Sequence, residues 1–161
     1  MLVLGVDPGA STGLVLANYY HEHRCSAVRW CRTVRDFQDV VSAMIEAREA
    51  GARVVAVETV AGYAWGPRAS ARVGQLVAAA RQVGEIVGVA KSIGLGTVEA
   101  TSRKWRRAVV GKSAVKDRFI SDVFTERGYP LPRCNAHARD AYGVALYVSA
   151  GLTLGLFEVE R

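Results

Sequence analysis

The sequence predicts an α/β fold in which a mixed five-stranded sheet is flanked by helices. Short runs of apolar, often β-branched residues alternate with longer segments whose apolar residues recur at helical spacing. The first two runs follow each other across a Pro-Gly turn, which predicts adjacent strands near the start of the chain. The predicted order is three strands, a helix, a strand, a helix, a strand and two helices, which favours one mixed sheet.

Five segments have the composition of strands. Residues 54–58 form a continuous apolar run, typical of a strand that is buried on both faces. Residues 27–33 carry Arg29 and Arg32 among apolar neighbours, which favours a position at the edge of the sheet. The predicted strands are residues 2–6, 13–18, 27–33, 54–58 and 96–100.

Four segments have the pattern of helices. The first is apolar at helical spacing and ends at Gly51, a stop signal. The third is amphipathic and is expected to turn four apolar side chains inward, namely Val115, Phe119, Ile120 and Val123. Residues 59–68 between strand and helix have the composition of a Gly/Pro loop. The predicted helices are residues 34–50, 69–92, 113–127 and 136–150.

Length, charge and cysteine content limit the class of protein. The chain has 161 residues, half of them hydrophobic, which suits a single domain over residues 1–161. Its net charge of +6 favours a polyanionic partner. The three cysteines predict reduced thiols of an intracellular protein. No apolar stretch has the roughly 20 residues of a membrane-spanning helix, and the first run is too short for a signal peptide, so we expect a cytoplasmic protein without a membrane partner.

The common nucleotide-binding and zinc motifs are incomplete. The glycines complete neither a phosphate-binding P-loop nor a dinucleotide fingerprint. His21, His23, Cys25 and Cys31 form a nominal zinc set, but their spacing matches no standard site. A solvated strand or hairpin is the favoured interpretation of that segment.

Four side chains from three predicted elements form a candidate catalytic and metal site. Asp7 follows the first strand, Glu58 ends the strand at residues 54–58, and His137 and Asp140 share one face at the start of the last helix. Alone, Asp7 suits a turn and Asp140 suits a helix start, whereas an unpaired carboxylate at the end of a buried strand is costly. Together they favour one metal site, because carboxylates suit Mg²⁺ or Mn²⁺ and imidazole adds a borderline ligand or a base.

These residues resemble the RuvC family of Holliday-junction resolvases, within the ribonuclease-H-like superfamily. The order of the acidic residues is that of the resolvases, whereas ribonuclease H carries its glutamate on the first helix. The departure is His137, where many members have Asp. The matching stretches run to about residue 150 and are Gly5-Val6-Asp7-Pro8-Gly9 with Thr12-Gly13, Ala56-Val57-Glu58 with Val73-Gly74-Gln75, Val109-Val110-Gly111 with Lys112 and Lys116, and His137-Ala138-Arg139-Asp140-Ala141.

The resemblance implies a ribonuclease-H-like fold and hydrolysis of phosphodiester bonds with two Mg²⁺ or Mn²⁺ ions. Asp7 is then expected to bridge the ions, with Glu58 and Asp140 completing the ligand shells. His137 is expected to be a ligand, or to orient or deprotonate the attacking water. The implied products carry 5′-phosphate and 3′-hydroxyl ends, the implied substrate is a four-way DNA junction, and the implied setting is a bacterial or phage-infected bacterial cell.

The densest basic stretch, residues 102–107, is the candidate DNA-binding segment. Basic residues interleaved with Trp105 suit a phosphate backbone; the alternative is a solvated helix face with a half-buried Trp105. By resemblance, an aromatic residue of the loop after Glu58 wedges into the junction centre. The expected DNA-binding residues are Tyr63, Trp65, Arg68, Arg72, Arg103, Lys104, Arg106, Arg107, Lys112 and Lys116.

Paired nicks across a junction imply a two-fold homodimer, because each chain carries one candidate site. The helix at residues 69–92 offers an apolar stripe for that contact, or the stripe only covers its own sheet. Two alternatives to a junction resolvase stay open. One is a broader endonuclease for forks, flaps and replication intermediates; the other is a non-catalytic junction-binding protein. The stripe comprises Val73, Leu76, Val77, Ala80, Val83 and Val87.

Overall fold

The five strands form one mixed sheet in the order β3-β2-β1-β4-β5. The computed structural model describes residues 1–20, 25–59, 69–130 and 135–159. Strand β1 pairs antiparallel with β2 and parallel with β4, β2 pairs antiparallel with β3, and β4 pairs parallel with β5. The predicted mixed sheet is confirmed, as is the edge position of the third strand. The strands are β1 (Leu2–Asp7), β2 (Thr12–Tyr20), β3 (Cys25–Val34), β4 (Val54–Thr59) and β5 (Gly96–Thr101).

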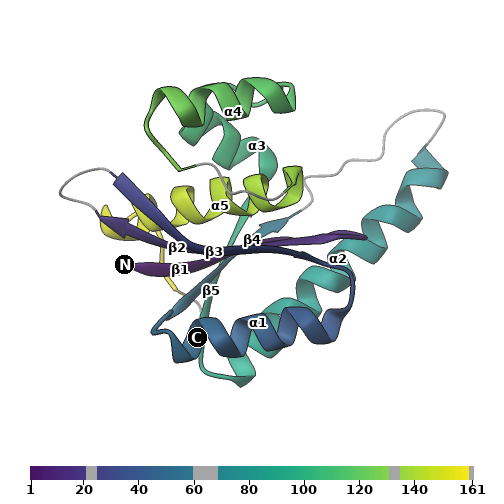
Figure 1. Cartoon of the computed structure of the whole chain (residues 1–161). Coiled ribbons are helices and arrows are strands. Elements are labelled where there is room, and N and C mark those ends of the chain that lie inside the picture. The colour runs from purple at the N-terminus through teal and green to yellow at the C-terminus, as the bar shows by residue number, and fades with distance from the viewer. Residues whose placement is uncertain (21–24, 60–68, 131–134, 160–161) are drawn as a thin grey trace.

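Helices cover both faces of this sheet (Figure 1). Helices α1 and α2 pack on one face, whereas α5 packs on the other and has α3 and α4 on its outer side. A π-helix, η1, continues directly from α3. The helical elements are α1 (Phe37–Glu49), α2 (Ala69–Ser92), α3 (Ser102–Trp105), η1 (Arg106–Val110), α4 (Asp117–Glu126) and α5 (Ala136–Thr153).

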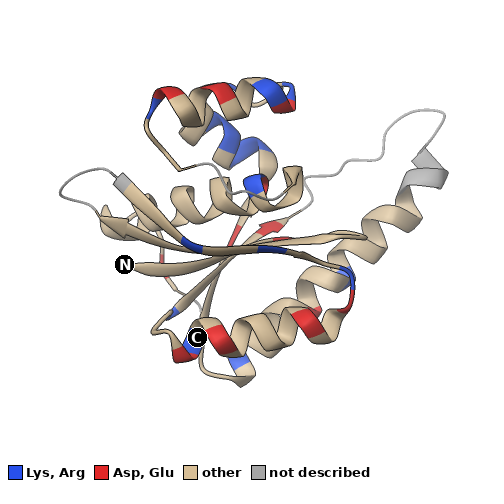
Figure 2. Cartoon of the chain, viewed as in Figure 1, with Lys and Arg blue, Asp and Glu red and all other residues tan. Residues whose placement is uncertain are grey.

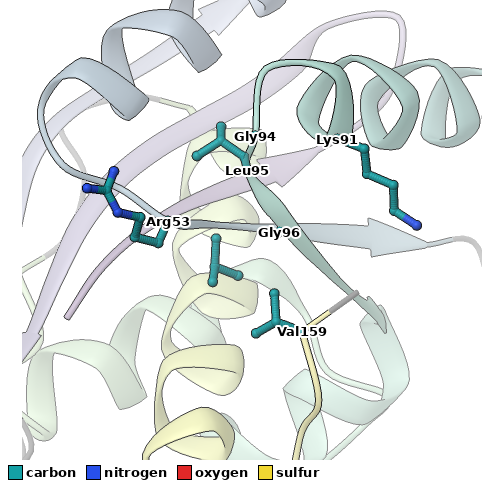
Figure 3. Close-up of a pocket in the computed structure, with 7 residues that line it drawn as sticks. Arg53, Lys91, Gly94, Leu95, Gly96 and Val159 are labelled. Carbon is teal, nitrogen blue, oxygen red and sulfur yellow. The ribbon is translucent and has the colours of Figure 1, made fainter. Parts of the chain in front are cut away.

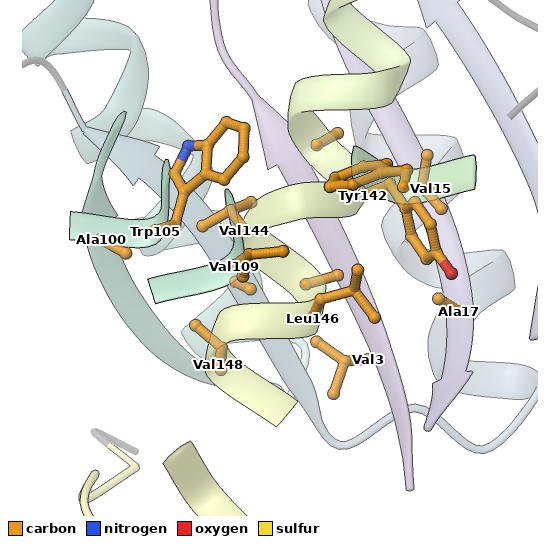
Figure 4. Packing of buried hydrophobic residues seen from close by; sticks show 14 of the residues in the cluster. Val3, Val15, Ala17, Ala100, Trp105, Val109, Tyr142, Val144, Leu146 and Val148 are labelled. Carbon is orange, nitrogen blue, oxygen red and sulfur yellow. The ribbon is translucent and has the colours of Figure 1, made fainter. Parts of the chain in front are cut away.

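Strand β1 shows why the central strands are apolar throughout. Successive side chains of a strand point to opposite faces. Val3 therefore joins the core under α5, whereas Leu4 and Val6 join the core under α1 and α2. Figure 4 shows the first of these cores, in which Trp105 and Tyr142 flank the apolar residues of α5. A continuous apolar run is thus what a strand between two helical layers requires.

Two glycines let the backbone of α5 approach the sheet closely. A Cβ on Gly5 in β1 would lie 2.0 Å from the carbonyl oxygen of Ala141. A Cβ on Gly13 in β2 would lie 2.2 Å from the carbonyl carbon of His137. Any other residue at these positions would push the helix away from the strands. The start of α5 is therefore held directly above the end of β1.

The structure departs from the sequence predictions between residues 102 and 127. The helix predicted at residues 113–127 begins only at Asp117, and Phe119 is 37% exposed instead of inward. The basic stretch is helical, as α3 and η1, and Trp105 within it is fully buried, whereas the alternative to DNA binding predicts a half-buried Trp105 on a solvated helix face. An indole is large and apolar enough to be drawn into the core even when its sequence neighbours are charged.

Two further findings concern the cysteines and the membrane. Cys31 takes part in a disulfide bond, so the prediction of reduced thiols is wrong for this residue. A count of cysteines cannot show which two sulfurs the fold brings together. Across the described ranges, the structure contains no helix with the length and apolar character that crossing a membrane requires.

Candidate functional site

The sheet places Asp7 and Glu58 side by side. Strands β1 and β4 are parallel neighbours, and Val6 of β1 pairs with Val57 of β4. The next residue of each strand is Asp7 and Glu58, at the carboxyl end of the sheet. Since side chains alternate between the faces, both carboxylates point to the α5 side, as Val3 does. The ends of two strands that are distant in sequence thus place two acids side by side.

Helix α5 adds His137 and Asp140 from above the sheet. Its N-cap is Asn135, whose side-chain oxygen accepts a hydrogen bond from the backbone N–H of Ala138 at 3.3 Å. The same oxygen accepts from the hydroxyl of Thr33 in β3 at 2.8 Å, which ties the helix start to the sheet. The Nδ1 atom of His137 lies 2.9 Å from Oδ2 of Asp7. The imidazole is 46% exposed and therefore accessible from solvent.

Asp140 is held by two arginines. The Nη2 atom of Arg106 donates to Oδ2 of Asp140 at 2.7 Å. The Nε and Nη2 atoms of Arg139 donate to Oδ1 at 3.0 and 2.8 Å. Arg139 also donates to the backbone carbonyl of Asp117 at 3.2 Å and forms an ion pair with its carboxylate. Both oxygens of Asp140 are thus engaged, and α4 is linked to the site through Arg139.

Glu58 has a neutral partner. The indole Nε1–H of Trp105 donates to Oε2 of Glu58 at 2.8 Å. The partner of Asp7, the exposed imidazole, is likewise not a permanent cation. The charge of these two carboxylates is therefore compensated less than that of Asp140.

Burial and mutual repulsion raise the pKa of both strand-end acids. Burial raises the pKa of Asp7 from 3.8 to about 6; the hydrogen bond from His137 opposes this, and the charge of Asp140 adds to it. Burial and the charge of Asp7 raise the pKa of Glu58 from 4.5 to about 7, against the hydrogen bond from Trp105. Such shifts in adjacent acids are typical of functional sites.

The donor set fits a divalent cation in its chemistry, but it is not assembled as a finished ligand shell. Carboxylates and an imidazole are suitable ligands for Mg²⁺ or Mn²⁺, and a cation would relieve the repulsion between Asp7 and Glu58. Within the described residues, however, no three His, Cys, Asp or Glu side chains are placed to hold one ion together. Both oxygens of Asp140 are engaged by arginines, whereas each carboxylate of Asp7 and Glu58 has one side-chain hydrogen bond in the described part of the chain.

The predicted DNA-binding residues fall into three groups. Arg103, Lys104 and Arg107 are exposed, in the same segment as Trp105 and Arg106, and α3 stands out as a basic element in Figure 2. Lys112 and Lys116 are exposed further along, and Lys112 Nζ lies 5.2 Å from the ring centre of Phe119. Arg106 instead turns inward to Asp140. The predictions for Tyr63, Trp65, Arg68 and the Arg72 side chain lie outside the described residues, as do His21, His23 and the Cys25 side chain of the nominal zinc set.

Three residues near the site carry no role predicted from sequence. Trp105 and Arg139 each hold a predicted metal ligand. Gln82 of α2 donates to Thr12 Oγ1 at 2.9 Å and to the carbonyl of Gly9 at 3.2 Å, which braces the turn after Asp7. The only sequence signal for Trp105 is its aromatic character within a basic run.

A pocket at the other end of the sheet is separate from these residues. It has a volume of about 570 Å³ and is lined by residues that include Arg53, Leu95 and Val159 (Figure 3). Arg53 precedes β4 and Leu95 precedes β5, whereas Glu58 lies near the end of β4. The pocket and the acidic residues therefore lie at opposite ends of the parallel strands.

The fold and this site arrangement can be compared with known proteins. No family model matches the sequence, and no curated protein sequence matches it. Among solved structures, Thermus thermophilus RuvC is similar with a TM-score of 0.73 and 16% identity, over 99% of both chains. The same protein in complex with a Holliday junction substrate gives a TM-score of 0.67 at 16% identity, again over 99% of both chains. The fowlpox virus Holliday junction resolvase gives 0.51 at 14% identity, over 96% of this chain and 99% of that one. Over nearly its whole length, the chain therefore has the ribonuclease-H-like fold of RuvC and other Holliday junction resolvases.

Proposed function

We propose that this protein is a metal-dependent, structure-specific DNA endonuclease that resolves four-way junctions by paired symmetric nicks. The observation that carries the proposal is the pair Asp7 and Glu58, two partly buried acids with raised pKa close to Asp140 and a basic helix. Neighbouring acids of this kind suit a cation, and the basic helix suits a polyanion. The fold is that of a protein solved in complex with a Holliday junction substrate.

In this proposal Asp7, Glu58 and Asp140 hold two Mg²⁺ or Mn²⁺ ions. When bound, such ions neutralise the phosphodiester and lower the pKa of an attacking water. His137 is the general base. If its Nδ1–H donates to Asp7, the neutral ring keeps Nε2 free to accept the proton of that water. The products carry 5′-phosphate and 3′-hydroxyl ends.

The basic residues position the DNA backbone across the acids. Arg103, Lys104 and Arg107 are exposed and suit non-bridging phosphate oxygens. Arg106 contributes from within the site. Its buried Nε has no hydrogen-bond partner among the described residues, and a phosphate oxygen would satisfy it. A guanidinium that leaves Asp140 for the phosphate also frees that carboxylate to bind a metal ion.

Two nicks in one junction require two sites related by symmetry, so the working form in this proposal is a homodimer. The N-terminal half of α2 supports this. Val83, toward its C-terminal end, is buried on the sheet, whereas Val77 is 62% exposed and Val73 is exposed as well. Part of the predicted stripe thus covers its own sheet, and the remainder is open to a second copy.

The test is cleavage of a strand-labelled four-way junction with Mg²⁺ or Mn²⁺, followed by mapping of the cut positions. Symmetric nicks in opposing strands are expected. Asp7→Asn is the matched control, because it removes a metal-binding charge while the basic residues remain, so it should bind the junction but not cut it. Near-normal cleavage by Asp7→Asn would remove Asp7 from the site. Equal cleavage of forks and flaps would favour a broader branched-DNA endonuclease.

The arginines on Asp140 favour one second candidate, a junction-binding protein without catalysis. An acid that is permanently paired with Arg106 and Arg139 would not bind metal. If this candidate is right, the protein should bind the junction tightly and cleave it with neither metal. Arg106 should also stay paired with Asp140 when DNA binds.

A further inference from the structure

Trp105 connects the basic segment to Glu58 by a single rigid side chain. Its indole is fully buried, and Nε1 donates to Oε2 of Glu58 at 2.8 Å. The other side of the ring lies against Gly143 of α5, where a Cβ would come within 2.4 Å of the indole. Figure 4 shows the ring beside Val144 in the same core. The indole therefore has little freedom to move unless its own backbone moves.

Trp105 lies in the segment whose charged residues are expected to contact DNA. Helix α3 is one turn long, capped by Thr101, whose hydroxyl oxygen accepts from the N–H of Lys104 at 3.3 Å. Arg103 and Lys104 are exposed and directly precede Trp105. The chain continues without a break into η1, a π-helix, a type of turn that is common at functional sites. Any shift of this turn would therefore move the indole and, with it, the carboxylate that accepts its hydrogen bond.

We propose that Trp105 is a positioning residue that couples junction binding to the ability of Glu58 to ligate a divalent cation. This inference rests on the proposed function. The indole fixes the Glu58 carboxylate, and contact of Arg103 and Lys104 with DNA sets the position of the indole. Junction binding and cation binding then strengthen each other, and the coupling factor is the same in both directions.

The coupling is measured as a ratio of affinities. Fluorescence anisotropy gives the dissociation constant of a four-way junction in EDTA and in Ca²⁺, with a linear duplex of equal charge as the reference for simple screening. For the unaltered protein, Ca²⁺ is expected to tighten junction binding by about fivefold or more relative to the duplex. Trp105→Phe keeps an aromatic ring but lacks the donor, so its ratio should fall to about one.

Trp30→Phe is the matched control, because Trp30 lies on the edge strand β3, away from the acids, and should keep the full ratio. A merely structural role for Trp105 would weaken junction binding equally in EDTA and in Ca²⁺ and leave the ratio unchanged. That result would overturn the inference.

A second readout does not depend on the folding of Trp105→Phe. In the unaltered protein labelled with ¹⁵N-tryptophan, the Trp105 indole resonance, assigned by elimination with Trp30→Phe and Trp65→Phe, should shift on adding junction in EDTA and again on adding Ca²⁺. A Trp105 resonance whose chemical shift does not change on adding the junction would contradict the coupling. Cleavage is measured separately. If the protein cuts junctions but the Trp105 resonance does not shift on adding DNA, the proposed function stands and this inference is wrong.

Discussion

The three acids of the site differ in what compensates their charge. Asp140 has two arginines, whereas Asp7 has an imidazole and Glu58 an indole. A bound cation would compensate the negative charge of Asp7 and Glu58 to an extent comparable with the two arginines at Asp140. The metal-free protein should therefore carry a stored electrostatic cost at Asp7 and Glu58 that depends on pH.

The sign of that pH dependence follows from the raised pKa values. Asp7 has its pKa near 6 when folded and 3.8 as the ordinary value, and Glu58 about 7 against 4.5, so the folded state binds more protons in between. The contribution of these acids to the free energy of unfolding thus falls as pH rises through this window. We expect urea unfolding in EDTA to show a loss on the order of 2 kcal/mol from these acids between about pH 5 and about pH 8.

Asp7→Asn is the control for this measurement, since an amide does not titrate. It should flatten the pH dependence and stabilise the metal-free protein at the higher pH. Mg²⁺ should restore stability to the unaltered protein at that pH and much less to the variant. If the metal-free protein became more stable as pH rises across this window, and Asp7→Asn removed that gain, the raised pKa of Asp7 would be contradicted.

Arg139 is the residue whose removal should cost the most stability near the site. It is buried, and its loss leaves Asp140 with one arginine and breaks the link to Asp117 in α4. We expect Arg139→Ala to lower the free energy of unfolding by about 3 kcal/mol, as for a buried ion pair that loses one partner. Arg139→Lys should recover only part, because a lysine cannot donate from two nitrogens. Arg107→Ala, an exposed control, should stay within about 0.5 kcal/mol.

At the scale of elements, α3 and η1 divide their basic residues between the exposed surface and the site. Arg103, Lys104 and Arg107 are exposed, whereas Arg106 is paired with Asp140. If an exposed side chain binds a phosphate, its replacement by alanine should reduce the slope of log affinity against log salt by about 0.9. The triple variant of the exposed three, measured by anisotropy at several salt concentrations, should show about that reduction per residue. Arg48→Ala on α1 serves as the control, on the opposite face of the sheet. An unchanged slope in the triple variant would leave these residues as a solvated face.

The elements that can be predicted from the sequence are those with one dominant pattern. Strand β4 is a continuous apolar run, and the pattern of α2 predicts residues 69–92, as observed. The segment from Ser102 to Val110 is not predicted as a defined helix, because two basic pairs around one tryptophan and a short apolar run do not define a helical face over so short a length. The late start of α4 at Asp117 has a similar cause, since the N-cap residue Lys116 makes no side-chain capping bond.

The site is less predictable than the strands that carry it. Asp7, Glu58 and Asp140 can be singled out because acids at the ends of apolar elements are unusual. The residues that pair with these acids cannot be predicted from the sequence. Arg106 and Asp140 are 34 residues apart in sequence, and Trp105 and Glu58 are 47 apart, so each pairing depends on tertiary structure. A sequence shows which charges exist, but the packing of α3 against α5 decides which of them meet.

At the scale of the whole molecule, α2 extends beyond the sheet and offers the surface proposed for the dimer (Figure 1). Val77→Asp should convert the dimer to a monomer, because a charge in an apolar contact is costly. Light scattering would measure this, and paired nicks should be replaced by slow single ones. Leu154→Asp is the matched control, since Leu154 is 64% exposed but lies just after α5. A protein that is monomeric without substitution and still makes paired cuts would contradict the role of α2.

The contact of α5 with Gly5 and Gly13 bears on how far sequences with this fold can diverge. There the helix rests on strand backbone and not on side chains, because even a methyl group would collide with Ala141 and His137. The height of His137 and Asp140 above Asp7 is therefore fixed by main-chain atoms, which every sequence shares. Apolar residues elsewhere in the core can be exchanged without changing that height. A chain that shares only 16% identity with a solved structure can thus retain the same fold.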